Sequence, residues 1–165
     1  MRVGVLTVSD RAFRGEREDA SGPLLRRLME ERLGAEVVAQ GVVPDEEGTI
    51  VARLEEWCDE LSLDLIITTG GTGFAPRDVT PEATRRVLER EAPGLAEAMR
   101  LEGLRKTPHA LLSRGVAGIR GRTLIVNLPG SPKAVREGLE VILPALPHAV
   151  ATLRGTAGED HAYHP

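Results

Sequence analysis

The sequence predicts an α/β fold, a three-layer α/β/α domain with a mostly parallel sheet. Short apolar runs rich in β-branched residues alternate with stretches whose apolar residues recur every three or four positions. Such runs are typical of strands buried in a parallel sheet, and the helical stretches between them supply the crossovers. The length of 165 residues fits one domain with one core.

Four runs are predicted as buried parallel strands, at residues 3–8, 36–43, 65–69 and 123–128. Between them, leucines at positions 24, 25, 28 and 33 predict one helix, and the apolar spacing from Ile50 to Leu61 predicts another. Thr80-Pro81 and Ser131-Pro132 each place a hydroxyl at the expected N-cap and a proline at the first helical position. Residues 93–121 contain two short helical patterns and are expected to form a subsidiary lobe or a sheet edge.

Composition and net charge limit the kinds of partner that this chain is expected to bind. The chain has 21 basic and 25 acidic residues, a net charge of −4 and no basic block. We therefore expect neither a nucleic acid nor a membrane as partner, and favour a small molecule. The single cysteine excludes an internal disulfide, and we expect a cytoplasmic protein. Residues 1–155 are predicted as one domain and 156–165 as a short tail.

The loops that follow the predicted strands are the candidate ligand-binding segments. In parallel sheets of this class, ligands bind beyond the carboxyl ends of the strands. All of these loops are expected to meet at one rim. The candidate residues are Ser9 and Asp10 after the first strand, Asp45 after the second, Gly70, Gly71, Thr72, Gly73 and Asp78 after the third, and Asn127, Pro129, Gly130, Ser131 and Pro132 after the fourth.

The TTGGTG segment at 68–73 is the strongest of these signals. Its glycines allow a backbone to approach a phosphate closely, and Thr72 adds a hydroxyl. The segment is neither a Walker A loop nor a GxGxxG fingerprint. Alone, it could be an ordinary tight turn. The loop at 127–132 repeats the pattern at another strand end, and together the two loops favour a phosphate-bearing ligand.

Asp45 and Asp78 are the carboxylates that we expect to hold Mg²⁺. This ion binds nucleotide phosphates through one or two carboxylates and retained waters. Each has a simpler interpretation: Asp45 could cap the helix that begins near Glu46, and Asp78 could pair with Arg77 on the surface.

Other reactive side chains are weaker candidates. Cys58 lies in an apolar helical stripe, which favours a buried structural thiol over a nucleophile. His109, His148, His161 and His164 do not form a zinc-binding spacing. Ser113 could simply stand at a helix end.

Several segments in order carry a family resemblance. They are VSDR at 8–11, PDE at 44–46, TTGGTG at 68–73, RDVTPEAT at 77–84, LSR at 112–114 and NLPGSPKAV at 127–135. Together they resemble the molybdenum-cofactor biosynthesis family of MogA-type and MoaB-type proteins, over about residues 1–154. The resemblance implies a trimer or hexamer and the transfer of AMP from Mg-ATP to the terminal phosphate of molybdopterin, with release of pyrophosphate.

The resemblance also implies roles for particular residues. Asp45 and Asp78 match the two essential aspartates of the family, while Thr72 and Ser113 match positions near the nucleotide and pterin. The glycines at 70, 71 and 73 and the loop at 129–132 would surround the phosphates.

Two alternative functions stay open. One is a catalytically silent MoaB-type protein that binds molybdopterin or acts as a scaffold. The other is a relative of the molybdate-insertion enzymes, but those carry extra domains that 165 residues cannot hold. Such an enzyme is instead a candidate partner, to which this protein would hand over its product.

For the trimer interface, the segment 93–121 is the candidate, with Leu95, Met99, Leu111 and Leu112 as its apolar residues.

Overall fold

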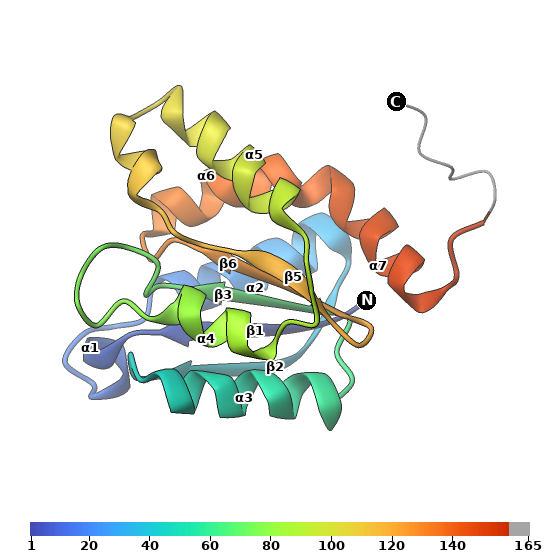
Figure 1. Ribbon diagram of the computed structural model, residues 1–165, viewed down its shortest axis with the longest axis horizontal. Coiled ribbons are helices and arrows are strands. Elements are labelled where there is room, and N and C mark those ends of the chain that lie inside the picture. Colours follow the sequence, from blue (N-terminus) through green and yellow to red (C-terminus); the bar gives the residue numbers. More distant parts are fainter. Residues whose placement is uncertain (159–165) are drawn as a thin grey trace.

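A computed structural model describes residues 1–158 and shows one six-stranded sheet between two layers of helices (Figure 1). The strands are β1 (Arg2–Val8), β2 (Glu36–Val43), β3 (Leu65–Thr69), β4 (Arg90–Glu91), β5 (Ala117–Arg120) and β6 (Thr123–Leu128). Their order is β2-β1-β3-β6-β5-β4. The first four in this order are parallel, whereas β5 and β4 run antiparallel to their neighbours. The predicted three-layer fold with a mostly parallel sheet is confirmed.

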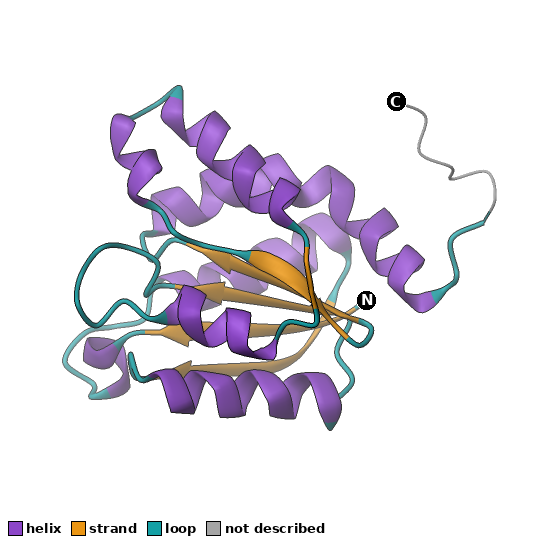
Figure 2. Cartoon of the chain, viewed as in Figure 1, coloured by secondary structure: helices purple, strands orange, loops and turns teal. Residues whose placement is uncertain are grey.

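Helices cover both faces of the sheet (Figure 2). The helices α2 (Ser21–Leu33), α5 (Pro93–Leu104), α6 (Pro132–Ile142) and α7 (Leu146–Arg154) pack on one face, and α3 (Glu47–Asp59) and α4 (Thr80–Val87) on the other. Short helical turns are α1 (Asp10–Phe13), η1 (Pro108–Leu112) and η2 (Leu143–Ala145). Successive side chains of β1 enter opposite cores: Val5 joins the α2–α6 side, and Leu6 the α3–α4 side.

The prediction that residues 36–43 form a buried strand is wrong for most of β2. Side chains along β2 alternate between exposed and half-buried, and only Val43 at its end is buried. The physical reason is its place at the edge of the sheet, where β1 is its sole strand neighbour in the described part of the chain. An apolar run therefore did not distinguish an edge strand from a central one.

The two predicted helix starts have different outcomes. Ser131 is the N-cap of α6, and its hydroxyl accepts a hydrogen bond from the Ala134 N–H at 3.1 Å, as predicted. Thr80 is not an N-cap, because the helix already begins there and Val79 precedes it. The Thr80 hydroxyl instead donates to the carbonyl of Gly70 at 2.9 Å. It thereby fastens α4 to the glycine-rich loop.

The segment 93–121 belongs to the edge of the sheet, one of the two predicted alternatives. It forms α5, η1 and then β5, which pairs with β6 and with the two-residue strand β4. A Cβ on Gly118 would lie 2.6 Å from the Arg90 carbonyl oxygen, so the approach of β4 to β5 requires glycine. Both strands escaped prediction because they are short and carry no clear alternation.

Two expectations fall partly or wholly outside the described residues. His161 and His164, with most of the predicted tail at 156–165, lie beyond residue 158. The domain boundary at residue 155 therefore stays a prediction. Within residues 1–158, every helix is too short or too polar to cross a membrane.

Candidate functional site

The candidate site lies where the order of the strands reverses. From β1, the chain moves to one side to form β2 and then returns to the other side to form β3. Ligands of open α/β sheets bind at such a point, outside the carboxyl ends of the strands. Here those ends are Val8 of β1 and Thr69 of β3.

Gly70 is the residue at which three of the loops meet. Its N–H donates to the Leu128 carbonyl at the end of β6, at 3.1 Å. A Cβ at this position would collide with the Val8 carbonyl oxygen, and its φ of +97° disfavours other residues. Gly130 also approaches closely, because a Cβ on it would lie 3.4 Å from the Gly70 Cα. The predicted convergence of the loops is therefore confirmed for β1, β3 and β6.

Two adjoining cavities open at this edge, of about 550 Å³ and about 410 Å³. Both are in the size range of small-molecule sites. All predicted site residues except Asp10 line one or both of them. The larger cavity is lined by Gly71, Thr72, Gly73, Asp78, Ser113, Asn127, Pro129, Gly130 and Ser131, and the smaller one by Ser9, Asp45, Gly70, Gly71, Asp78, Gly130, Ser131 and Pro132. Four residues line both cavities and form the border between them: Gly71, Asp78, Gly130 and Ser131.

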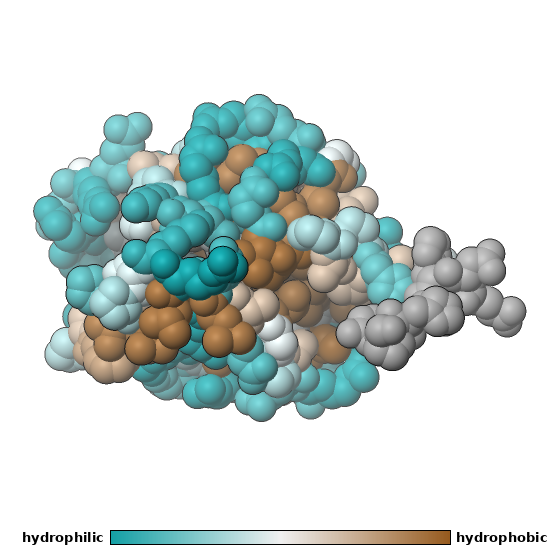
Figure 3. Space-filling model, turned by 90° about the horizontal axis from the view of Figure 1, so that it is seen from above, coloured by the Kyte–Doolittle hydropathy of each residue, from teal (hydrophilic) through white to brown (hydrophobic). Residues whose placement is uncertain are grey.

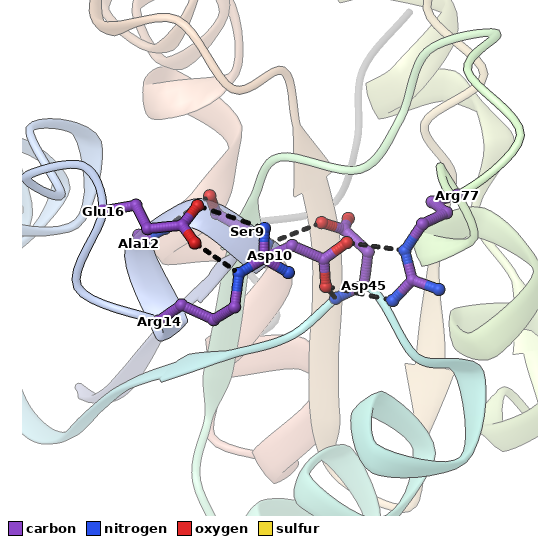
Figure 4. A network of polar contacts seen from close by, with 7 residues as sticks. All are labelled: Ser9, Asp10, Ala12, Arg14, Glu16, Asp45 and Arg77. Carbon is purple, nitrogen blue, oxygen red and sulfur yellow. Dashed lines mark hydrogen bonds and ion pairs between the residues drawn. The ribbon is translucent and has the colours of Figure 1, made fainter.

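A polar network ties the β1 and β2 loops together (Figure 4). The Asp10 N–H donates to Asp45 Oδ2 at 2.8 Å, and the Asp45 N–H donates to Asp10 Oδ1 at 3.0 Å. Arg77 donates to both Asp10 oxygens, at 2.6 and 3.0 Å. These hydrogen bonds hold the pKa of Asp10 below its ordinary value, with Arg77 as the largest cause. Asp10 thus serves to orient Asp45. The Asp10 carboxylate itself is already paired with Arg77.

Asp45 carries a charge that its surroundings disfavour. Burial raises the pKa of this carboxyl, and the charges of Asp10 and Asp78 raise it further, against the hydrogen bond from the Asp10 N–H. Its second oxygen, Oδ1, lies 3.1 Å from the position that a Cβ on Gly71 would take. The N-cap of α3 is Glu46, so the interpretation of Asp45 as a helix cap is wrong. An incompletely compensated carboxylate beside a cavity is a candidate binding group.

The Asp78 side chain lies against the glycine-rich loop. Its Oδ2 accepts a hydrogen bond from the Ala75 N–H at 3.0 Å and would lie 2.9 Å from a Cβ on Gly73. The surface pair with Arg77 is not formed, because that arginine binds Asp10. Asp78 lines both cavities and interacts electrostatically with Asp45.

Arg114, of the LSR segment, holds this loop in place. Its backbone N–H donates to the Thr72 carbonyl at 2.8 Å, and its guanidinium donates to the carbonyls of Gly73 at 2.8 Å and Asp78 at 2.7 Å. The guanidinium also forms an ion pair with Glu82 of α4. The side chain thus joins the glycine-rich loop, the backbone at Asp78 and the following helix.

The glycine-rich loop presents free backbone donors. Among residues 1–158, no group accepts a hydrogen bond from the N–H of Gly71, Thr72 or Gly73. Gly71 has a φ of +69°, and a Cβ there would collide with Thr80 Oγ1. Consecutive unpaired N–H groups of this kind form anion-binding sites.

Two of the predicted polar residues differ in what they can offer a ligand. The Asn127 amide is saturated by the protein: it donates to Thr68 and Thr84 at 3.0 Å each and accepts from the Val116 N–H at 3.1 Å. The Ser113 hydroxyl, which also lines the larger cavity, has no hydrogen-bond partner in the described part of the chain. Asn127 therefore braces the site, and Ser113 has a hydroxyl to offer.

Sequence reasoning missed several polar residues of the smaller cavity, among them Asp19 and Ser21. Asp19 accepts hydrogen bonds from the Thr7 hydroxyl at 2.7 Å and the Gly22 N–H at 2.9 Å. The Ser21 hydroxyl donates to the Gly130 carbonyl at 2.7 Å. An aspartate three residues before a helical N–H is a capping signal that could have located Asp19.

Asp45 and Asp78 are the residues that could hold a metal ion. No group of three or more His, Cys, Asp or Glu side chains suited to a metal occurs within residues 1–158. A closed protein cage is therefore not what these carboxylates form. Two carboxylates beside free backbone donors fit Mg²⁺, which keeps several waters and takes further oxygens from substrate phosphates.

Cys58 is confirmed as a buried thiol. It packs with Trp57 in the α3–α4 core, and burial raises its pKa to about 11. Its side chain lines neither cavity.

The comparisons with known proteins agree with the geometry. The family described as a probable molybdopterin binding domain matches residues 4–148. The chain belongs to this family. A molybdopterin adenylyltransferase from Helicobacter pylori J99 is 46% identical over 156 residues, which cover 94% of this chain and 89% of that protein.

Two other members show the range of this family. The crystal structure of the MoaB enzyme from Thermus thermophilus is 61% identical, with a TM-score of 0.88, over 93% of this chain and 96% of that one. The Drosophila melanogaster molybdenum cofactor synthesis protein cinnamon is 52% identical over 147 residues. The match covers 89% of this chain and 24% of cinnamon, so the family domain also occurs inside much longer proteins.

Proposed function

We propose that this family member is a molybdopterin adenylyltransferase that acts on molybdopterin and Mg-ATP. The observation that carries the proposal is the pair of adjoining cavities that meet at Gly71, Asp78, Gly130 and Ser131. Two substrates can occupy the two cavities and bring their phosphates together at this border. Similarity to adenylyltransferases over nearly the whole chain supports the same reaction.

The reaction joins two phosphate groups. An oxygen of the terminal phosphate of molybdopterin attacks the α-phosphorus of ATP. The bond from that phosphorus to the bridging oxygen of the β-phosphate breaks, and pyrophosphate leaves. Such a transfer depends on positioning and charge stabilisation, and the attacking phosphate is already ionised at neutral pH.

The chain supplies both requirements. The unpaired N–H groups of Gly71, Thr72 and Gly73 would bind phosphate oxygens, and the Ser113 hydroxyl would orient a substrate in the larger cavity. Asp45 and Asp78 would hold Mg²⁺, which when bound neutralises the charge of the triphosphate. Asp10 and Arg77 would keep Asp45 in position.

Pyrophosphate release tests this function. We expect release only when wild-type protein, molybdopterin and Mg-ATP are all present. Asp78→Asn keeps the size of the side chain and removes its charge, so we expect at least a roughly 100-fold lower rate at unchanged folding. Asp59→Asn on α3, outside both cavities, is the matched control. Equal rates for wild type and Asp78→Asn would contradict the proposed role of Asp78.

A catalytically silent binding protein is the second candidate, favoured by the 61% identity to a protein designated MoaB. It predicts that wild type binds molybdopterin and releases no pyrophosphate. The same assay, with a parallel binding titration, separates the two functions. For either one, we propose a cytoplasmic protein that hands its bound pterin to a molybdate-insertion enzyme.

The proposed assembly is a trimer, alone or paired into a hexamer. Leu101, Leu104, Leu111 and Leu112 are all more than two-fifths exposed on α5 and η1. Figure 3 shows the face seen from above, where apolar side chains gather between polar ones. Leu95 and Met99, the other residues predicted for this interface, pack against the core instead. A monomer in light scattering would contradict the trimer.

A further inference from the structure

The larger cavity extends from the glycine-rich loop into the space between α5, η1 and α6. Two glycines allow these elements to pack closely. A Cβ on Gly138 of α6 would lie 3.2 Å from Met99 Sδ, and one on Gly103 of α5 would lie 2.8 Å from the Ala110 Cβ of η1. Arg100, on the same helix as Met99, lines this cavity. The close packing of α5 against α6 and against η1 therefore fixes the position of Arg100.

Within residues 1–158, Arg100 is anchored through one nitrogen only. Its Nη1 donates to the Gly115 carbonyl at 2.8 Å and to the Ser113 carbonyl at 3.4 Å. Both acceptors belong to the segment that carries the LSR serine. These are neutral groups, so the contacts hold the guanidinium in place without compensating its charge.

The carboxylates of the same cavity are engaged elsewhere. Glu137 lies 3.9 Å from Lys106 and 4.0 Å from Lys133, and Glu102 lies 3.4 Å from Arg105. The third, Asp78, accepts its hydrogen bond from a backbone N–H. In the part of the chain that the structure describes, Arg100 has no ion pair with any of them.

The unused edge of Arg100 is the one that this chain elsewhere uses to bind carboxylates. Four arginines each donate through Nε and Nη2 to a single carboxylate: Arg14, Arg77, Arg120 and Arg154. In Arg100 the Nε–Nη2 edge has no partner within residues 1–158, while Nη1 is fixed. Two parallel N–H groups in this geometry match two oxygens of a phosphate.

We propose that Arg100 binds a phosphate group of a substrate in the larger cavity through its Nε–Nη2 edge. The inference rests on the proposed function for the identity of the two phosphate substrates, ATP and molybdopterin. The carbonyls of Ser113 and Gly115 hold the guanidinium in advance, so little side-chain entropy is lost when the anion binds. The chain as a whole has a net charge of −4, which does not attract an anion. Arg100 supplies a positive charge locally, in the larger cavity.

Separate binding titrations of ATP, molybdopterin and inorganic pyrophosphate test this inference. Arg100→Lys keeps the positive charge and can still donate to the Gly115 carbonyl, but it lacks the second parallel N–H. We expect affinity for one of the two substrates to fall roughly 10-fold or more, because a charge-assisted bidentate contact becomes a single one. The substrate that weakens identifies the source of the phosphate.

The control and the temperature separate binding from folding. Arg86→Lys on α4 is the matched control, since Arg86 is exposed, pairs with Glu47 and lines neither cavity. Titrations are made well below the melting temperature of every variant. A loss for one substrate, with the other within two-fold of wild type, is a result that a purely structural arginine would not produce.

Three results would overturn the inference. They are equal affinities of wild type and Arg100→Lys for all three probes, wild-type binding to none of them, and equal losses for all three with a lowered melting temperature. The first of these, with normal pyrophosphate release, would leave the adenylyltransferase function intact. Conversely, a selective loss of binding without any wild-type turnover would support the phosphate contact and contradict the catalytic function.

Discussion

Replacing Asn127 by alanine should destabilise the fold rather than act through ligand contacts. Its side chain is 1% exposed and makes three hydrogen bonds, to Thr68, Thr84 and Val116. At about 1 kcal/mol net for each bond, the loss is about 3 kcal/mol, and the orphaned Val116 N–H adds to it. For a chain of this size, this lowers the melting temperature by roughly 6–12 °C.

Thermal and guanidinium unfolding followed by circular dichroism measure this change. Thr84→Val removes a single one of the three bonds and should cost about 1 kcal/mol, which calibrates the larger loss. Ligand affinity, measured where both proteins are fully folded, should change little. A free energy of unfolding of Asn127→Ala within about 1 kcal/mol of wild type would contradict this structural role of Asn127, as would weaker substrate binding at unchanged stability.

Four further outcomes are expected. Ser113→Ala should lower turnover with stability within about 0.5 kcal/mol of wild type, because the hydroxyl has no protein partner in the described chain; a large loss of stability in urea titration would contradict this. Arg154→Ala should cost about 2 kcal/mol in the same titration, since it leaves the buried Asp64 carboxylate with the Arg2 N–H alone. Iodoacetamide at pH 8 should label native Cys58 at least about 100-fold more slowly than the unfolded chain, as a pKa raised from 9.0 to about 11 leaves roughly 0.1% thiolate; comparable rates by mass spectrometry would refute burial. Gly71→Ala should abolish turnover and lower the melting temperature, because its Cβ would collide with the Thr80 hydroxyl oxygen.

Four of the six strands and most helices were predictable because their signals are local, whereas the short strands β4 and β5 were missed. Apolar runs and helical spacing located β1, β2, β3 and β6, and the hydroxyl–proline pair at Ser131 located the start of α6. Burial was less predictable, as β2 shows, because an edge strand and a central strand can share one composition. The start of α4 differed because the Thr80 hydroxyl is taken by the Gly70 carbonyl, a tertiary contact.

The sequence predicted where the site lies better than it predicted what each residue does there. All of the candidates from the strand-end loops except Asp10 line a cavity, since parallel strands bring those loops to one edge. The residues of α5, η1 and α6 that line the larger cavity were not predicted as site residues. Roles depended on contacts between distant residues. Arg77 binds Asp10, 67 positions away, rather than its neighbour Asp78. Arg100 was missed because an arginine on a helix carries no signal of what its other edge will face.

The proposed function requires that AMP, and no other part of ATP, is transferred to molybdopterin. A single-turnover reaction with ATP labelled at the α-phosphorus, with products separated by chromatography, follows this transfer. We predict that the label appears on molybdopterin in equal amount to the pyrophosphate released, and that Asp78→Asn yields neither. Label that remains in ATP while molybdopterin is bound, or that appears as ADP, would contradict adenylyl transfer by this chain.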